Sequence, residues 1–262
     1  MSWIEALILG VIQGLTEFLP VSSSGHLEIG SVLLGVQASD NLLFAIVVHL
    51  ATALATVLVF RKDIIQLITE LFQFKWNEST QFLFKIAISM IPVFVVGVFF
   101  KDTVESFFTG NLVLVGSMLL ITGLLLLFAH FRNSGGKQVG FVDAFLIGLA
   151  QAVAVLPGIS RSGATISTAL LLGVERSKAA RFSFLMVLIP IMGASLLQAK
   201  DYAENPSAHG VSTMVLIIDF LAAFVAGYIA CKWMIAIVKR GKLTHFAIYC
   251  FIIGAIAIIS SF

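Results

Sequence analysis

Six long apolar runs constrain the fold of this chain more than any other feature of its sequence. A helix needs about 20 predominantly apolar residues to cross the hydrocarbon core of a bilayer. In lipid, only helices and closed barrels satisfy every backbone hydrogen bond. The runs therefore predict an all-α polytopic membrane protein with six transmembrane helices, at 42–60, 84–100, 112–131, 182–199, 211–238 and 244–262.

The composition agrees with a chain that is surrounded by membrane lipids. Hydrophobic residues make up 59% of the 262 residues and charged residues 11%, whereas charged residues make up roughly 25% of an average soluble domain. The net charge is +2, and the basic residues are dispersed along the chain. A nucleic-acid partner needs a clustered basic surface, so none is expected.

Two further apolar segments are interrupted by short polar motifs. The first breaks at PVSSSGH and resumes to residue 36, and the second breaks at PGISRSG and resumes to residue 174. Each half is too short to cross a bilayer, and irregular backbone at membrane depth persists only inside protein or beside water. We therefore expect two re-entrant helical hairpins, each made of two half-helices.

The two interrupted segments resemble one another. GVIQGLTEFLPVSSSGHLEIGSVLLGV (10–36) aligns with GLAQAVAVLPGISRSGATISTALLLGV (148–174), with a one-residue shift near the prolines. Each copy holds one hairpin and three spans, and an odd number of crossings inverts the second copy. The sequence thus predicts one membrane domain, 1–262, built as an inverted-topology repeat of about 1–131 and about 140–262. In such folds, binding sites form where the copies meet.

Loop charges predict the orientation, because lysine and arginine concentrate on the cytoplasmic side of a membrane. Twelve basic residues fall in the loops that the span pattern places on one side, and two fall in the loops on the other side. The first group of loops is 61–85, 132–143, 174–181 and 239–242, and the second is 101–111 and 199–212. This bias places both termini and the first hairpin on the outer (periplasmic) side of the plasma (inner) membrane.

Each break carries residue types that begin helices and bind anions there. Ser, Thr and Gly cap helix starts, where unpaired N–H groups and the positive end of the dipole favour an anion. Two such starts arriving from opposite sides would converge on one point, and a phosphate group suits that point. The candidate substrate-binding residues are Gln13 and, at the breaks, Ser22, Ser24, Gly25, Gly158, Ser160, Ser162, Gly163 and Thr165.

Arg161 and Glu17 are charged residues placed within these apolar hairpins. A guanidinium there needs a partner, and its planar fork matches phosphate oxygens. A structural ion pair with Glu17 is the alternative, and it is compatible with phosphate binding if substrate competes for the fork. Glu17 lies four residues after Gln13, on one helix face, where it could ligate a divalent cation or act on an imidazole. A surface role for Glu17, and polar packing between helices for Gln13, stay open.

Ser23 and His26 are the candidate nucleophile and base. Their spacing of three residues makes the side chains neighbours if the segment is helical, and a hydroxyl beside an imidazole is a pairing that activates an alcohol. In a variant of this mechanism, His26 itself is the nucleophile. Thr165 follows the repeat counterpart of His26 by one residue. The first hairpin is therefore expected to supply the reacting groups, and the second the guanidinium.

The motifs QGLTEFLPVSSSGH and PGISRSGAT resemble those of the bacterial undecaprenyl-diphosphate phosphatase family, membrane enzymes associated with bacitracin resistance. The family's first motif, Glu or Gln, three residues, then Glu, is met by Gln13 and Glu17. Its second motif, Pro-Gly-x-Ser-Arg-Ser-x-x-Thr, is met from Pro157 to Thr165. Many members have Glu where this chain has Gln13, and Thr where it has Ser24. Because Gln13 is an amide, this chain departs from a mechanism that requires two carboxylates on the first half-helix.

The resemblance implies an enzyme that removes the terminal phosphate of a C55 polyprenyl diphosphate at the outer face of the membrane. It also implies a divalent cation, Mg²⁺ or Ca²⁺, which we expect near Glu17. A homodimer is left open. The alternative function is a lipid-phosphate flippase, because inverted repeats with broken helices are typical of transporters. An intramembrane serine hydrolase is a weaker alternative, because an arginine and two anion-binding helix starts suit phosphate better than an acyl group.

Overall fold

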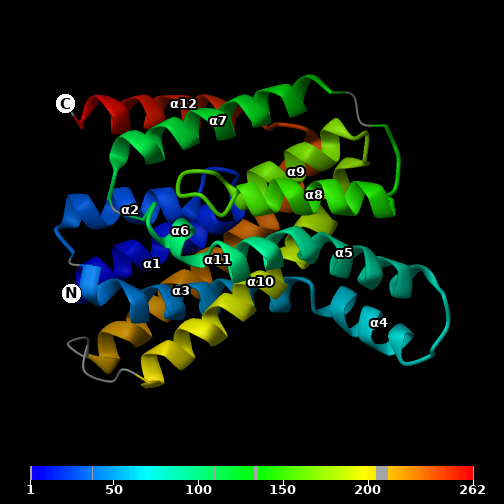
Figure 1. Ribbon diagram of the computed structural model, residues 1–262, viewed down its shortest axis with the longest axis horizontal. Coiled ribbons are helices and arrows are strands. Elements are labelled where there is room, and N and C mark those ends of the chain that lie inside the picture. Colours follow the sequence, from blue (N-terminus) through cyan, green and yellow to red (C-terminus); the bar gives the residue numbers. More distant parts are fainter. Residues whose placement is uncertain (1, 37, 109, 133–134, 205–211, 262) are drawn as a thin grey trace.

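A computed structural model shows a bundle of helices (Figure 1), and it describes residues 2–36, 38–108, 110–132, 135–204 and 212–261. Within these ranges no strand forms, and Lys137 and Val174 make an isolated bridge. The all-α prediction is confirmed. The helices are α1 (Trp3–Phe18), α2 (Ser23–Leu34), α3 (Ala38–Val59), α4 (Arg61–Leu71), α5 (Glu78–Phe99), α6 (Lys101–Glu105), α7 (Leu112–Phe131), α8 (Phe141–Val153), α9 (Arg161–Leu171), α10 (Arg176–Glu204), α11 (Thr213–Arg240) and α12 (Thr244–Ile259).

Four helices are long and apolar enough to cross a membrane, which fits a multi-pass membrane protein. They are α5, α7, the Arg176–Leu196 part of α10, and α11. A fifth span results if Phe44–Val59 and Arg61–Leu71 count together, although the chain bends there by 75°. The apolar helix α12 has 16 residues, which is short of the length that a straight span requires. The predicted spans at 42–60 and 244–262 therefore remain predictions.

Both interrupted segments break where the sequence predicts. The first helix ends at Phe18 and the next begins at Ser23, while the matching pair ends at Val153 and begins again at Arg161. Each half-helix packs against its partner, α1 on α2 and α8 on α9. None of the four exceeds 16 residues, or about 24 Å at 1.5 Å per residue.

The region 61–85, which the sequence analysis treats as a loop, is largely helical. It contains α4 and the first turns of α5. The reason lies in its pattern, because Ile64, Leu67, Ile68 and Leu71 recur at the spacing of one helix face. Leu67 is buried among the core residues, while Ile68 and Leu71 are exposed.

The helices of the two halves make matching contacts. The first half-helix of each hairpin packs on a long helix from the other half of the chain, α1 on α11 and α8 on α5. The last helices, α7 and α12, lie side by side along one edge of the molecule (Figure 1). The middle helices α3 and α10 also pack on one another. The halves are therefore intertwined rather than separate.

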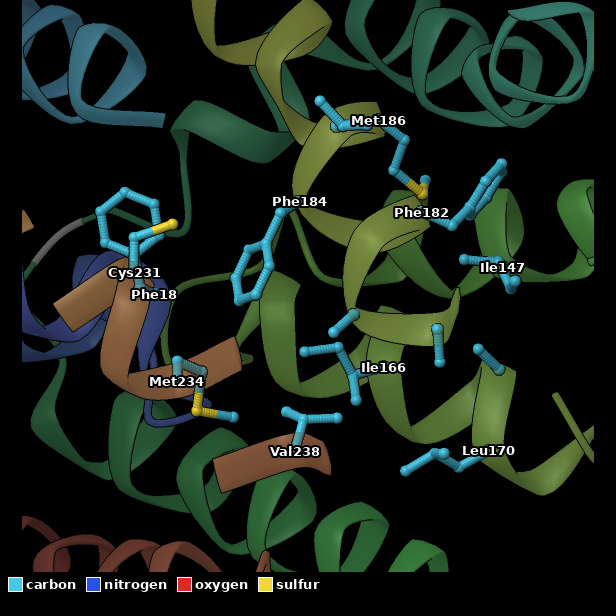
Figure 2. Packing of buried hydrophobic residues seen from close by; sticks show 14 of the residues in the cluster. Phe18, Ile147, Ile166, Leu170, Phe182, Phe184, Met186, Cys231, Met234 and Val238 are labelled. Carbon is cyan, nitrogen blue, oxygen red and sulfur yellow. The ribbon is translucent and has the colours of Figure 1, made fainter. Parts of the chain in front are cut away.

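The buried core joins the hairpins to the long helices. Figure 2 shows Phe184 of α10 directed toward Phe18 of α1, and their ring centroids are 6.0 Å apart. Met234 and Val238 of α11 and Ile166 of α9, labelled in the same view, belong to one buried cluster. Phe18 follows Glu17 directly in the sequence, so this packing helps to fix the end of α1 where the polar residues gather.

Candidate active site

Glu17 is the centre of a buried polar cluster. Its Oε2 accepts hydrogen bonds from Gln13 Nε2 at 2.9 Å and from Ser23 Oγ at 2.6 Å. Its Oε1 lies 3.4 Å from a terminal nitrogen of Arg161. The Glu17 side chain is only 4% exposed. The structure thus brings together four of the predicted site residues, and it confirms the ion pair between Arg161 and Glu17.

The local structure of α1 explains how Glu17 reaches this position. Gln13 and Glu17 are one helical turn apart, so their side chains lie on one face and bond to each other. Gly14 lies between them and allows a close approach to α11, because an added Cβ would come within 2.5 Å of the Ala223 carbonyl oxygen. The helix stops one residue after Glu17, and Leu19 is extended.

Serine residues cap both helices that begin at the breaks, as the sequence predicts. Ser22 Oγ accepts from the Gly25 N–H at the start of α2, and Ser160 Oγ accepts from the Gly163 N–H at the start of α9. A second serine, two residues after each cap, places its hydroxyl close to the capping hydroxyl. Ser24 Oγ lies 3.4 Å from Ser22 Oγ, and Ser162 Oγ lies 3.2 Å from Ser160 Oγ.

The two breaks lie against one another in the middle of the bundle. A Cβ at Gly25 would lie 3.1 Å from Gly158 Cα, and a Cβ at Gly163 would lie 3.3 Å from Pro20 Cβ. The Ser162 hydroxyl donates to the Leu19 carbonyl at 3.2 Å, across the same contact. The predicted meeting of the two helix starts is therefore confirmed, and an added Cβ at Gly25 or Gly163 would make a tight contact across it.

Arg161 is the first residue of α9, and its side chain is 25% exposed. One terminal nitrogen contacts Glu17. Within the described residues, no other hydrogen bond of its guanidinium is found. A guanidinium carries five N–H donors, so most of its donors are free to bind a ligand beside Glu17.

A small recess opens beside the ion pair. Its polar end is formed by Glu17, Arg161 and Ser162. The remaining lining comes from α1, α3 and α10, namely Phe18, Thr56, Phe184, Val187, Leu188 and Ile191. The recess therefore combines anion-binding groups with an apolar wall.

The predicted hydrogen bond between Ser23 and His26 is not formed. The Ser23 hydroxyl donates to Glu17, while His26 Nδ1 lies 2.8 Å from the Ser22 carbonyl oxygen and Nε2 lies 2.8 Å from the Tyr249 hydroxyl. Both nitrogens of the His26 ring already have other partners, so neither is left for the Ser23 hydroxyl. A charged carboxylate is also the stronger acceptor for the Ser23 hydroxyl.

Thr165 does not reach the cluster with its hydroxyl. Its Oγ1 donates to the Arg161 carbonyl at 2.9 Å within α9, and the residue is fully buried. Threonine hydroxyls in helices often bond the preceding turn in this way. Thr165 therefore supports the helix that carries Arg161 and has no direct contact with the recess.

Three residues near the site are absent from the candidates that the sequence indicates. Thr122 of α7 accepts from the Ser160 N–H at 3.1 Å and lies 3.2 Å from the Gly158 carbonyl. His49 of α3 lies within electrostatic range of Glu17 and Arg161. Tyr249 of α12 bonds His26. Of these three residues, only His49 has a sequence pattern that could have identified it. His49 and Thr56 are seven residues apart, so they lie on one polar face of α3.

The side chains of the site could hold a divalent cation only if the phosphate groups of the substrate also bind that cation. No group of three His, Cys, Asp or Glu side chains that could hold a metal ion is found in the described part of the chain. Gln13 Oε1, however, is buried without a hydrogen-bond partner, and its amide bonds Glu17. Mg²⁺ is commonly held by one or two carboxylates together with substrate phosphates. Glu17 and Gln13 therefore fit a cation that also binds a diphosphate.

Comparison with known proteins agrees with this chemistry. The family model described as Bacitracin resistance protein BacA matches residues 6–256. The chain belongs to this family. The match covers nearly the whole sequence, so it includes both hairpins and all the long helices.

Several relatives carry the name undecaprenyl-diphosphatase. One from Bacteroides thetaiotaomicron is 55% identical over 262 residues, covering 99% of each chain. One from Bacteroides fragilis is 54% identical over 263 residues, covering 100% of this chain and 99% of its own. One from Methanobrevibacter smithii is 37% identical over 277 residues, covering 100% of this chain and 98% of its own. This chain is thus similar to undecaprenyl-diphosphatases over its full length.

Proposed function

We propose that this chain is an undecaprenyl-diphosphatase, which hydrolyses undecaprenyl diphosphate to undecaprenyl phosphate and inorganic phosphate. This reaction would recycle the lipid carrier of peptidoglycan synthesis. Full-length similarity to relatives with that name supports the activity. The observation that carries the proposal is the contact of Glu17 with both Ser23 and Arg161, because it joins a nucleophile, a proton acceptor and a phosphate-binding cation.

Arg161 and the start of α9 bind the diphosphate in this proposal. The free N–H groups of the guanidinium match phosphate oxygens, and the first N–H groups of a helix favour an anion. In phosphoryl transfer the charge spreads over the oxygens of the transferred group, and catalysis depends mainly on positioning and electrostatic stabilisation. Arg161 would therefore bind the transition state more strongly than the substrate, as catalysis requires.

Ser23 is the nucleophile, and Glu17 accepts its proton. The Ser23 oxygen forms a bond to the terminal phosphorus while the bond from that phosphorus to the bridging oxygen breaks, and undecaprenyl phosphate leaves. Water then hydrolyses the phosphoserine and releases inorganic phosphate. We assign the proton to Glu17 rather than His26, because Ser23 Oγ lies 2.6 Å from the Glu17 carboxylate. A loose transition state needs little help from a base, so a carboxylate suffices.

A divalent cation, Mg²⁺ or Ca²⁺, would be held by Glu17, by the free amide oxygen of Gln13 and by the diphosphate. When bound, such an ion neutralises charge that develops on the phosphate oxygens. Oxygen ligands are those that both ions prefer. The amide at Gln13 in place of a second carboxylate fits an ion that is shared with the substrate.

The active site faces the outer side of the membrane in this proposal, and the two hairpins are the re-entrant parts of an inverted repeat with six spans. The matching helix contacts of the two halves support the repeat. The two chain ends lie at one end of the molecule, and the α4–α5 connection lies at the other (Figure 1). Twelve basic residues fall in the loops that would be cytoplasmic, which supports the orientation. A homodimer stays open.

Phosphate release by the purified protein tests the function. We expect inorganic phosphate from a C55 diphosphate in detergent, with loss of release when a chelator removes divalent cations. Phosphate release from a C15 diphosphate, compared with release from the C55 diphosphate, measures the contribution of the long apolar tail. A flippase without phosphatase activity would release no phosphate, and that result would refute the proposal.

Mapping the phosphorylated residue tests the mechanism. Rapid acid quenching during turnover should trap phosphate on Ser23, and Ser23→Ala should abolish both the trapped phosphate and turnover while the protein still inserts into membranes. Phosphate on His26 would favour the alternative nucleophile. Phosphate on neither residue would contradict both covalent mechanisms.

A further inference from the structure

His26 connects α12 to the break between α1 and α2. Its Nδ1 lies 2.8 Å from the Ser22 carbonyl oxygen, and its Nε2 lies 2.8 Å from the hydroxyl of Tyr249, a residue 223 positions away in the sequence. The two rings are nearly parallel, with an angle of 12° and centroids 5.5 Å apart. The imidazole is therefore held from both sides, and neither nitrogen is directed at Ser23.

The hydrogen-bond partners fix the proton on the ring. A carbonyl oxygen only accepts hydrogen bonds, so Nδ1 must carry a hydrogen and donate it to Ser22. In a neutral imidazole the other nitrogen then carries the lone pair, which leaves Tyr249 as the donor to Nε2. The resulting chain runs from the Tyr249 hydroxyl through His26 to the Ser22 carbonyl.

Ser22 is the residue that this chain of bonds holds in place. Its φ of 69° is positive, a region that residues other than glycine rarely occupy unless the surrounding structure imposes it. Its carbonyl accepts from both the backbone N–H and the Nδ1 of His26, at 3.1 and 2.8 Å, while its hydroxyl caps Gly25. Ser23 follows directly, so the orientation of the Ser22 peptide determines whether the Ser23 hydroxyl meets Glu17.

We propose that Tyr249 is a positioning residue for the nucleophile, acting through His26 on the Ser22 carbonyl. The inference rests on the proposed function, because it takes Ser23 as the nucleophile. It gives His26 a role that needs no contact with the reacting phosphate. Residues that orient a reacting group are expected to change kcat rather than substrate binding, since small misplacements lower the fraction of productive geometry.

The test compares Tyr249→Phe with Tyr228→Phe. The first variant keeps the ring beside His26 and removes the hydroxyl, whereas the second removes a hydroxyl that accepts from Lys232 at 3.1 Å on α11, with no bond to the site. Loss of one hydrogen bond in the chain should lower kcat about tenfold in Tyr249→Phe and leave KM unchanged. Tyr228→Phe should match the wild type. Wild-type kcat in Tyr249→Phe, or a change confined to KM, would overturn the proposal.

A double variant tests the route through His26. In a His26→Leu background, adding Tyr249→Phe should cause no further loss, because an apolar side chain leaves the hydroxyl no hydrogen-bond partner at this position. A full additional tenfold loss would show that Tyr249 acts by another route, and would overturn the proposal. Equal melting temperatures of the single variants in detergent would exclude unfolding as the cause.

Nitrogen-15 NMR of histidine-labelled protein tests the arrangement independently of turnover. The signals absent from His26→Gln identify His26, and we expect a hydrogen on Nδ1 and a hydrogen-bonded, unprotonated Nε2. In Tyr249→Phe, the Nε2 signal should move toward that of a free acceptor nitrogen. A hydrogen on Nε2 in the wild type would overturn the proposal. Absence of phosphate release by the wild type would instead refute the proposed function, and the NMR result would still decide the arrangement.

Discussion

Glu17 makes three contacts that each constrain a different residue of the site. Its two oxygens hold Gln13, Ser23 and Arg161 within hydrogen-bonding distance. A carboxylate so placed is shielded from water, and such charges occur inside membrane proteins when they are paired and functional. The ion pair leaves the serine and the guanidinium on either side of one carboxylate, which is the arrangement that phosphate binding next to a nucleophile requires.

The planar guanidinium group of Arg161 is the side chain that matters most for phosphate recognition. We expect Arg161→Lys to lower kcat/KM by about 10²–10³-fold, because an ammonium keeps the charge and loses the planar donors. Steady-state phosphate release measures this. The control is Arg181→Lys, which makes the same change in a residue that pairs with Asp63 at 2.6 Å and does not line the recess. Similar losses in both variants would contradict a specific role for Arg161.

Gln13 should set the affinity for the divalent cation. Gln13→Glu places a second carboxylate beside Glu17, so the cation concentration for half-maximal activity should fall about tenfold or more, because affinity rises with ligand charge. Gln13→Leu removes the free amide oxygen and should raise that concentration. Titration of chelated protein with Mg²⁺ and Ca²⁺ measures both effects. Identical cation dependence in the wild type and the two variants would show that the ion binds elsewhere.

Among the helices, α1 and α8 differ in the partners of their glutamines. Gln13 bonds Glu17, whereas both amide atoms of Gln151 are buried without a partner and Val155 lies four residues later. Each helix packs closely on a long helix of the other half, through Gly14 against α11 and Gly148 against Ser89 of α5. Close packing is thus common to α1 and α8, while a carboxylate four residues after the glutamine occurs in α1 and not in α8.

The close contact between α1 and α11 should be sensitive to a single methyl group. In Gly14→Ala the Cβ would lie 2.5 Å from the Ala223 carbonyl oxygen and 2.8 Å from the Gly227 nitrogen. The helices must separate, which should cost about 1–3 kcal/mol of stability and displace Glu17. Thermal melting in detergent and phosphate release measure these effects.

Gly97→Ala is the matched control for this prediction. It makes the same change in α5, where no atom lies within 4 Å of the added Cβ. Melting and activity should therefore equal or slightly exceed those of the wild type, because alanine favours a helix more than glycine does. If Gly14→Ala were equally harmless, α1 would not be held by this contact.

At the scale of the whole molecule, labelling of single cysteines tests the membrane orientation. Cys231 and Cys250 are buried, so they should contribute little background. Ser106→Cys and Gln73→Cys place exposed thiols in the two opposite groups of loops. We expect a membrane-impermeant maleimide to label Ser106→Cys in intact spheroplasts, and Gln73→Cys only after permeabilisation. The reverse pattern would place the site on the cytoplasmic side.

Much of the architecture follows from the sequence alone. Apolar runs, the two breaks and their serine caps depend on local physics, namely burial of apolar surface in lipid and unpaired N–H groups at helix starts. The pairing of Arg161 with Glu17 was predictable because a lone guanidinium among apolar residues needs a partner. Local patterning also indicates α4, because its apolar residues recur at helical spacing among the charges.

The hydrogen-bond partners of the polar groups in the first hairpin depend on how distant helices pack. Ser23 bonds Glu17, six residues earlier, and His26 bonds Tyr249, 223 residues later. Both outcomes depend on the positive φ of Ser22 and on the position of α12. Sequence spacing describes neighbours along one helix, and it carries no information on how separate helices are turned toward each other. The residue types at the two breaks were therefore set by the sequence, and their hydrogen-bond partners by the packing of distant helices.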